Sequence, residues 1–181
     1  MRWNVLGISL LALSPIASTA QTVTPSSAVE RYGNWEVVRY NSGGDAPMCA
    51  LAIRSAMARI ALSPQGEGSL ALAVTVTDGP RTPPADDAVI RVRGVGGAPV
   101  AEISLPVDAF HIRPSRPPVT QMSAVLRQPA AVEELLRIGR THAELHLLLP
   151  QGPIFTLPES GFAEAWDAVK RCDPGRSAGM P

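Results

Sequence analysis

Lysine, aromatic residues and cysteine are all scarce in this chain of 181 residues. Lys170 is the only lysine, aromatic residues make up 4% of the chain, and there are 2 cysteines. The 16 basic and 16 acidic side chains cancel to a formal net charge of zero, so the charge balance gives no reason to expect nucleic acid or an anionic membrane as a partner. With so few aromatic rings, the core must come mainly from Ala, Val, Leu and Ile, each of which buries a modest area.

Sequence patterns typical of catalytic, cofactor and metal sites are also missing. The chain has no Gly-x-Ser-x-Gly or Ser-x-x-Lys motif, and the glycine-rich stretch 94–97 lies between two strand-like segments rather than before a helix. His142, Glu144 and His146 alternate along one strand-like segment, which would hold the two histidines about 13 Å apart, too far to bind one metal ion readily. We therefore predict no catalytic, cofactor-binding or metal-binding residue and no cofactor.

The two cysteines, Cys49 and Cys172, are 123 positions apart (172 − 49). They form no Cys-x-x-Cys redox pair, and no further Cys or His lies at the short spacing that a zinc site needs. In an oxidising compartment two isolated cysteines usually pair, so we predict a structural disulfide between Cys49 and Cys172. Closing so long a loop would stabilise the fold by up to roughly 5 kcal/mol.

The first 20 residues have the composition of an export signal. Arg2 supplies a positive start, residues 5–13 form a short and largely apolar run, and residues 18–20 are the small residues Ser, Thr and Ala. The run is far shorter than the roughly 20 apolar residues of a membrane-spanning helix. A membrane anchor or a buried strand is the alternative interpretation. We expect cleavage after residue 20, export to the periplasm or the outer surface, and no transmembrane anchor afterwards.

The rest of the chain predicts one mainly β domain over residues 31–172. Residues 21–30 are rich in Thr and Ser and predict a flexible lead-in, and residues 173–181 predict a disordered tail. Prolines between residues 110 and 126 indicate that strands there are short or lie at a sheet edge. The segments 88–95 and 100–105 flank a Gly-Gly-Ala-Pro turn and predict a hairpin. The other predicted strands cover residues 35–40, 48–57, 69–77, 142–149 and 153–157.

Two short helices are predicted in the second half of the domain. The first covers residues 130–138 and is expected to end at Gly139. The second covers residues 161–171, with Ser160 as its N-terminal cap. Its buried face is expected to carry Phe162, Trp166 and Val169. Together with the strands, these helices favour a β-sandwich or an open barrel, with Trp35 and Trp166 in the core.

Segments near both ends of the predicted domain carry a family resemblance. Residues 32–37 read Tyr-Gly-Asn-Trp-Glu-Val and are followed, after a turn, by Met-Cys-Ala-Leu at residues 48–51. The closing pattern of a helix, a glycine, paired strands and a Gly-Phe-x-x-Ala helix covers residues 136–139, 145–147, 152 and 157–166. These segments resemble the invasion-associated locus B family of Gram-negative bacteria, exported proteins that typically show a Gly-Asp-Trp-x-Val strand followed by a cysteine-bearing strand.

The resemblance implies a periplasmic or surface-associated protein of β-sandwich type that is linked to host-cell interaction, and it brings no catalytic residues. Asn34 replaces the usual Asp, Tyr40 stands where a further cysteine is common, and residues 57–127 do not align with the family pattern. We therefore expect a non-enzymatic protein that contacts another protein or a cell-envelope component. The alternative is a periplasmic enzyme or enzyme inhibitor whose site is built from residues distant in sequence.

Arginines near the proline-rich segment are the candidate interaction residues. The three that could form a small anion-binding patch are Arg113, Arg116 and Arg127. Exposed sheet faces or edges, with Trp35 or the arginine-bearing loops, are further candidate contact surfaces, although core positions are the preferred interpretation of Trp35. The enzyme alternative would instead be favoured by a pocket that combines a carboxylate with His111, His142 or His146.

Overall fold

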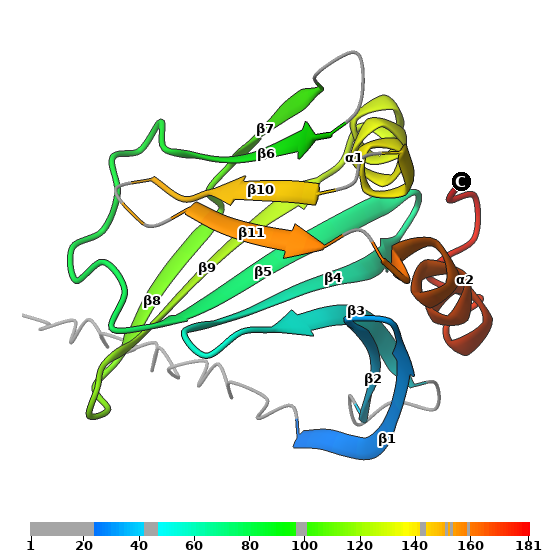
Figure 1. Cartoon of the computed structure of the whole chain (residues 1–181), viewed down its shortest axis with the longest axis horizontal. Helices are drawn as coiled ribbons and strands as arrows, with labels where there is room; N and C mark the ends of the chain where they lie inside the picture. Colours follow the sequence, from blue (N-terminus) through cyan, green and yellow to red (C-terminus); the bar gives the residue numbers. More distant parts are fainter. Residues whose placement is uncertain are drawn as a thin grey trace, which may run out of the picture.

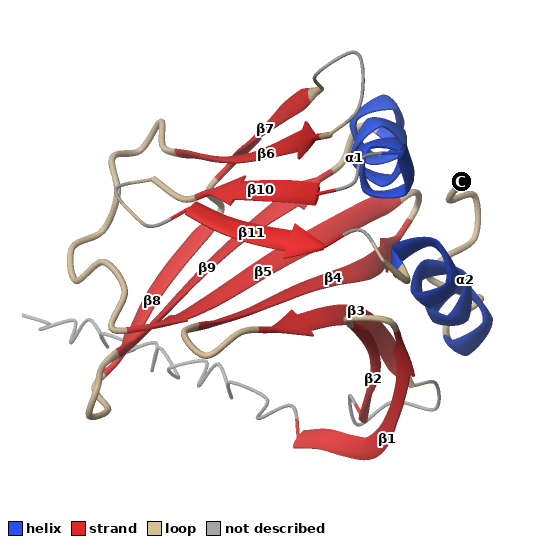
Figure 2. Cartoon of the chain, viewed as in Figure 1, coloured by secondary structure: helices blue, strands red, loops and turns tan. Residues whose placement is uncertain are grey.

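The protein is described by a computed structural model, which covers residues 24–41, 47–96, 101–141, 144–150, 152, 154–158 and 160–181. Two antiparallel sheets and two helices make up the described chain (Figures 1 and 2). The predicted mainly β class, with two helices in the second half, is confirmed, and the two open sheets correspond to the sandwich form. The predicted signal segment, residues 1–20, lies outside the described residues.

The larger sheet has seven strands in the order β1-β2-β3-β4-β5-β9-β8. Its first five strands form a meander, after which β9 pairs with β5 and β8 pairs with β9. In β4, β5 and β9 every second residue is buried, so one face of the sheet packs on the core and the other face is more open. The bounds are β1 Thr24–Tyr32, β2 Trp35–Asn41, β3 Met48–Arg54, β4 Ala58–Gly66, β5 Ser69–Thr77, β8 Ala109–Arg113 and β9 Val119–Leu126.

The smaller sheet has four strands in the order β11-β10-β6-β7 and packs against the inner face of the larger one. The predicted hairpin is confirmed, because β6 and β7 pair antiparallel. Side chains from both sheets belong to one apolar core, with Ile90, Val92 and Leu147 from the smaller sheet meeting Leu72 and Val74 from the larger one. The bounds are β6 Val89–Val95, β7 Glu102–Pro106, β10 Glu144–Leu148 and β11 Ile154–Pro158.

Both helices, α1 (Pro129–Thr141) and α2 (Phe162–Cys172), lie at the same end of the two sheets, on the right of Figure 1. Helix α2 contacts β2 and β3, and α1 contacts β6 and the neighbouring strands. Trp35 and Trp166 are 1% and 0% exposed, which confirms that both are core residues. The ring of Phe162 packs edge-on against Trp35, with 5.1 Å between ring centroids.

The predicted end of α1 and the predicted N-terminal cap of α2 both need correction. Helix α1 continues through Gly139 to Thr141, so Gly139 does not end it. A Cβ atom at Gly139 would lie 2.5 Å from the Phe162 ring, so the glycine is needed for the close approach of the two helices. Ser160 does not cap α2, because the cap position is Gly161, which has a φ of 87° and no side-chain cap hydrogen bond.

Three segments of the larger sheet differ from the expectation. Residues 24–30, which the composition assigns to a flexible lead-in, belong to β1 and pair with β2. Residues 58–66 form β4, where no strand was predicted. In the proline-rich region β8 is short and at the sheet edge as expected, but β9 has eight residues and lies between β5 and β8. The prolines fall in the β8–β9 loop, so they do not interrupt β9.

The C-terminal residues 173–181 are packed against the helices and are not a disordered tail. Asp173 is 4% exposed and forms an ion pair with Arg176 at 3.2 Å. Met180 is 9% exposed and joins the core. The indole Nε1 of Trp166 donates a hydrogen bond to the carbonyl oxygen of Pro181 at 3.2 Å. The composition of this segment does not indicate that it is ordered, because its ordered conformation depends on contacts with residues distant in sequence.

Met180→Ala is expected to lower the free energy of unfolding by about 2 kcal/mol, because a side chain packed on the core is removed. Urea denaturation followed by tryptophan fluorescence would measure the change. Ala178→Ser is the matched control, since Ala178 is exposed in the same segment and should change stability by less than about 0.5 kcal/mol. Equal stability of the two variants would show that residues 173–181 do not pack as described.

Candidate functional site

The predicted disulfide is confirmed. Cys49 in β3 and Cys172 at the end of α2 are bonded, with their Cα atoms 6.1 Å apart. The bond fastens α2 to the inner face of the larger sheet, where Cys49 is fully buried. Since both cysteines of the chain are used in this bond, it indicates an oxidising compartment and a structural role.

The β1–β2 turn abuts the start of α2 in a packed seam. A Cβ atom at Gly33 would collide with the carbonyl oxygen of Ser160, and one at Gly161 would collide with the carbonyl oxygen of Tyr32. The backbone N–H of Asn34 donates a hydrogen bond to the Ser160 carbonyl at 3.4 Å. These residues therefore have a packing role, and an open site must be sought elsewhere on the surface.

Two side chains near the helices have a raised pKa. The hydrogen bond that Tyr32 donates to the Glu30 carboxylate, at 2.8 Å, raises the pKa of Tyr32. Hydrogen bonds to Glu134, at 2.7 and 2.8 Å, raise the pKa of Arg137. Both pairs are exposed, so they are surface interactions rather than signs of a reactive centre.

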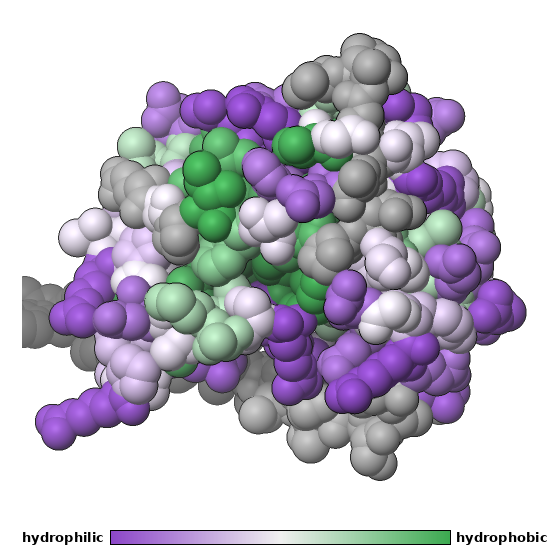
Figure 3. Space-filling model, viewed as in Figure 1, coloured by the Kyte–Doolittle hydropathy of each residue, from purple (hydrophilic) through white to green (hydrophobic). Residues whose placement is uncertain are grey.

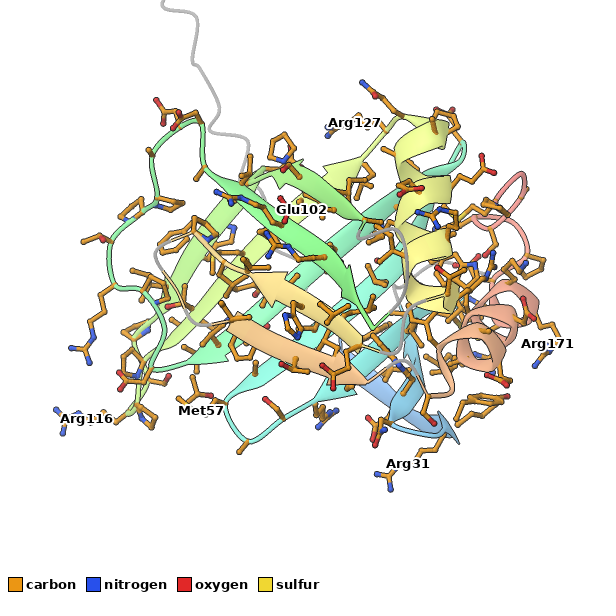
Figure 4. All side chains as sticks on the ribbon, turned by 45° about the horizontal axis from the view of Figure 1, so that its top comes forward. Arg31, Met57, Glu102, Arg116, Arg127 and Arg171 are labelled. Atoms are coloured by element: carbon orange, nitrogen blue, oxygen red, sulfur yellow. A yellow bond between two sulfur atoms is a disulfide. The ribbon has the colours of Figure 1, made fainter. Side chains whose placement is uncertain are left out.

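The structure does not bring the three predicted arginines together. Arg113 ends β8, and Arg116 lies in the β8–β9 loop at one end of the sheet. Arg127 follows β9 at the opposite end, near α1 (Figure 4), with its Nη1 3.7 Å from the carboxylate of Asp108. The eight residues of β9 separate the two ends by roughly 25 Å. Arg113 and Arg127 accordingly line two different pockets, and Arg116 lines neither of them.

The histidines do not form a site with carboxylates in the part of the chain that the structure describes. His111 is exposed on β8, and His146 lies on the outer face of the smaller sheet with its Nε2 3.4 Å from Glu144. His142 lies outside the described residues. Neither His111 nor His146 lines any of the pockets formed by the described residues that are considered below, and the described residues contain no group of three or more metal-binding side chains.

A pocket of about 400 Å³ opens on the outer face of the larger sheet. We call it the outer-sheet pocket. Five strands contribute to it, namely β2, β4, β5, β8 and β9, so residues distant in sequence meet there. Its described lining residues are Tyr40, Arg59, Ala61, Ala73, Thr75, Arg113 and Gln121.

The strand register explains how these side chains meet. Arg59 pairs across the strands with Thr75, and Thr75 pairs with Gln121, so the three form one row on the outer face. Ala61 pairs with Ala73 in the next row and forms a shallow floor. Their neighbours along each strand are buried, because successive residues of a strand point to opposite faces.

Arg59 is held in place by Tyr40. The Nη2 of Arg59 donates a hydrogen bond to the Tyr40 hydroxyl at 2.5 Å, and the guanidinium carbon lies 5.8 Å from the Tyr40 ring centroid. The Nε of Arg59 is buried and has no hydrogen-bond acceptor among the described residues. The guanidinium group is therefore positioned but not neutralised by its surroundings.

The pocket carries positive charge without a counter-charge in its described lining. Arg59 and Arg113 form no ion pair with any described carboxylate. By contrast Arg54, the cross-strand neighbour of Arg59, pairs with Glu36 at 3.5 Å. Two guanidinium groups beside a hydroxyl and an amide are suited to holding an anion.

Sequence reasoning found Arg113 but missed Tyr40, Arg59, Thr75 and Gln121 as members of one site. The alternation of β4, β5 and β9 marks Arg59, Thr75 and Gln121 as outward-facing, which is a local signal for each residue but not for their proximity. The order of the strands, with β9 between β5 and β8, decides which outward residues become neighbours.

Other hollows and apolar surfaces have less distinctive chemistry. A pocket of about 240 Å³ between the sheets includes Ile53, Ile60 and Phe155. Two further pockets lie beside α1 and beside the loop before β6. Figure 3 shows apolar surface where β10 ends and β11 begins. Ile154, the first residue of β11, is 61% exposed. These surfaces are apolar or shallow, and they lack the paired cations of the outer-sheet pocket.

Comparisons with protein-family models, with curated proteins and with solved structures find no significant match to this chain. Within the described residues, no helix is both long enough and apolar enough to cross a membrane. The basis for a functional proposal is therefore the disulfide, the sequence features and the outer-sheet pocket.

Proposed function

We propose that this chain is an exported, non-enzymatic binding protein of the periplasm or the outer surface, of the invasion-associated locus B type. It contacts a protein or a cell-envelope component in the course of host-cell interaction. The observation that supports this most directly is the outer-sheet pocket, where Arg59 and Arg113 present positive charge to solvent on an open sheet face. Such a surface is suited to recognising an anionic partner.

Export is supported by two independent features. The first 20 residues have the order of a signal peptide, with a basic start, an apolar run and small residues at the end. The Cys49–Cys172 disulfide is typical of proteins in an oxidising compartment. The residues on which the family resemblance rests pack α2 against the β1–β2 turn. A fold in common with that family would therefore be enough to explain why these residues resemble its sequence pattern.

Crosslinking in intact cells tests the binding proposal. A photoreactive residue at Gln121, in the outer-sheet pocket, is expected to capture a protein or envelope component. The same residue at Ser104, which is exposed on the smaller sheet, is the control and should capture no specific partner. Conversion of a soluble metabolite captured at Gln121 into a product would support the alternative of a periplasmic enzyme, and equal labelling at both positions would contradict a site in this pocket.

The export proposal makes a separate prediction. N-terminal sequencing of the protein recovered from the periplasm or the medium is expected to begin at or near Gln21, because the small residues before it fit a signal peptidase. Replacing the apolar Leu10 and Leu11 by Asp should leave the full-length chain in the cytoplasm, since the apolar run is then broken. Recovery of an exported chain that still begins at Met1 would exclude cleavage.

A further inference from the structure

We propose that the outer-sheet pocket binds a phosphate group between Arg59 and Arg113. This inference rests on the proposed binding function and names the ligand chemistry of that same site. The phosphate is carried either by an envelope lipid or by a soluble phosphorylated molecule. Both sources present the same tetrahedral oxyanion to the two guanidinium groups.

The positions of the two arginines suit a phosphate group. Arg59 comes from β4 and Arg113 from β8, with β5 and β9 between them, so their strands are about 14 Å apart. Both side chains line the same pocket. A phosphate directs oxygens toward both sides at once, whereas the two oxygens of a carboxylate lie in one plane. Arginine forms bidentate hydrogen bonds with phosphate.

The guanidinium group of Arg59 is already held in a fixed position for such a ligand. Its hydrogen bond to Tyr40 uses Nη2, and its buried Nε still lacks an acceptor among the described residues. A guanidinium group that no described carboxylate neutralises can form charge-assisted hydrogen bonds to an anionic ligand. Because Tyr40 already restrains the guanidinium, less conformational entropy is lost on binding.

The rest of the pocket accommodates a small group attached to the phosphate. Ala61 and Ala73 leave the floor free of long side chains, and Thr75 and Gln121 add a hydroxyl and an amide. The volume of about 400 Å³ lies within the range of small-molecule pockets, roughly 300–1,000 Å³. A phosphate with part of its carrier would fit, and the carrier could continue into solvent.

Calorimetric titration with inorganic phosphate at low ionic strength tests the proposal. The wild-type protein is expected to bind it, and Arg59→Met and Arg113→Met should each weaken binding by about tenfold or more. Tyr40→Phe should weaken it less, by about threefold, because only the positioning of Arg59 is disturbed. Arg91→Met is the matched control, since Arg91 is an exposed strand arginine on the other sheet, and its affinity should be unchanged.

Thermal unfolding of each variant would show whether it is folded. If Arg59→Met does not fold, Arg113→Met decides the result, because the exposed Arg113 has no described partner to lose. Absence of phosphate binding by the wild-type protein would overturn the proposal. Binding that is weakened equally by Arg91→Met would overturn it as well, since it would reflect surface charge alone.

Vesicle sedimentation and competition with inorganic phosphate identify the molecule that carries the phosphate. Vesicles of phosphatidylcholine containing phosphatidic acid should sediment with the protein, and inorganic phosphate should compete, if the carrier is a lipid. Binding of inorganic phosphate without vesicle binding would assign a soluble carrier. If phosphate does not bind while the photoreactive residue at Gln121 still captures a partner, the phosphate proposal fails and the binding function stands.

Discussion

Loss of the Cys49–Cys172 disulfide is expected to lower the free energy of unfolding by roughly 2–5 kcal/mol. The bond joins residues 123 positions apart, so breaking it restores to the unfolded state the large chain entropy that closing so long a loop removes. It also attaches α2 to β3, and the core contains few aromatic residues to compensate for the loss. A change of this size would be a large part of the stability of an ordinary domain.

Urea denaturation with and without a reductant would measure this effect, with tryptophan fluorescence as the probe because Trp35 and Trp166 are buried. The double variant Cys49→Ala/Cys172→Ala is the control. It should be destabilised to a similar extent and should show no further change in reductant. An unfolding midpoint that does not move on reduction would contradict a stabilising role for the bond.

The parts of the fold that follow from local patterns were predictable from the sequence. Strand β5 has the predicted bounds, Ser69–Thr77, because its buried and half-buried residues alternate without interruption. The β6–β7 hairpin follows from two strand-like segments around a glycine-rich turn. The disulfide follows from the number of cysteines and the export signal, without any knowledge of which elements it joins.

The parts that were missed depend on contacts between distant elements. Gly139 has the local character of a helix end, but the ring of Phe162 makes a glycine necessary inside α1. Residues 173–181 have the composition of a loose tail, but Met180 finds a place in the core and Pro181 accepts a hydrogen bond from Trp166. Local propensity is a weak guide where such tertiary contacts compete with it.

The candidate site illustrates the same limit. The alternation of β4 and β9 places Arg59 and Gln121 on the outer face, which the sequence can indicate. Their proximity to Arg113 depends on β9 lying between β5 and β8, and no local pattern specifies that order. Proximity in sequence instead suggested Arg127, which is separated from Arg113 by the length of β9.

Gly161→Ala is expected to destabilise the fold by roughly 2–5 kcal/mol. Two effects act together at this position. Gly161 has a φ of 87°, and an alanine in the left-handed region costs about 1–2 kcal/mol. Its new Cβ would also collide with the Tyr32 carbonyl oxygen and lie 2.9 Å from the Gly33 nitrogen. Because these atoms are backbone, the strain cannot be relieved by a side-chain rotation, and overpacking adds about 1–3 kcal/mol.

Gly68→Ala separates the two effects. Gly68 has a φ of 71°, in the same left-handed region, but no atom lies within 4 Å of a Cβ at this position. It should therefore lose only the conformational part, about 1–2 kcal/mol. The difference between the two variants in urea denaturation measures how tightly the start of α2 packs on the β1–β2 turn. If both variants lose the same amount, the seam is looser than described.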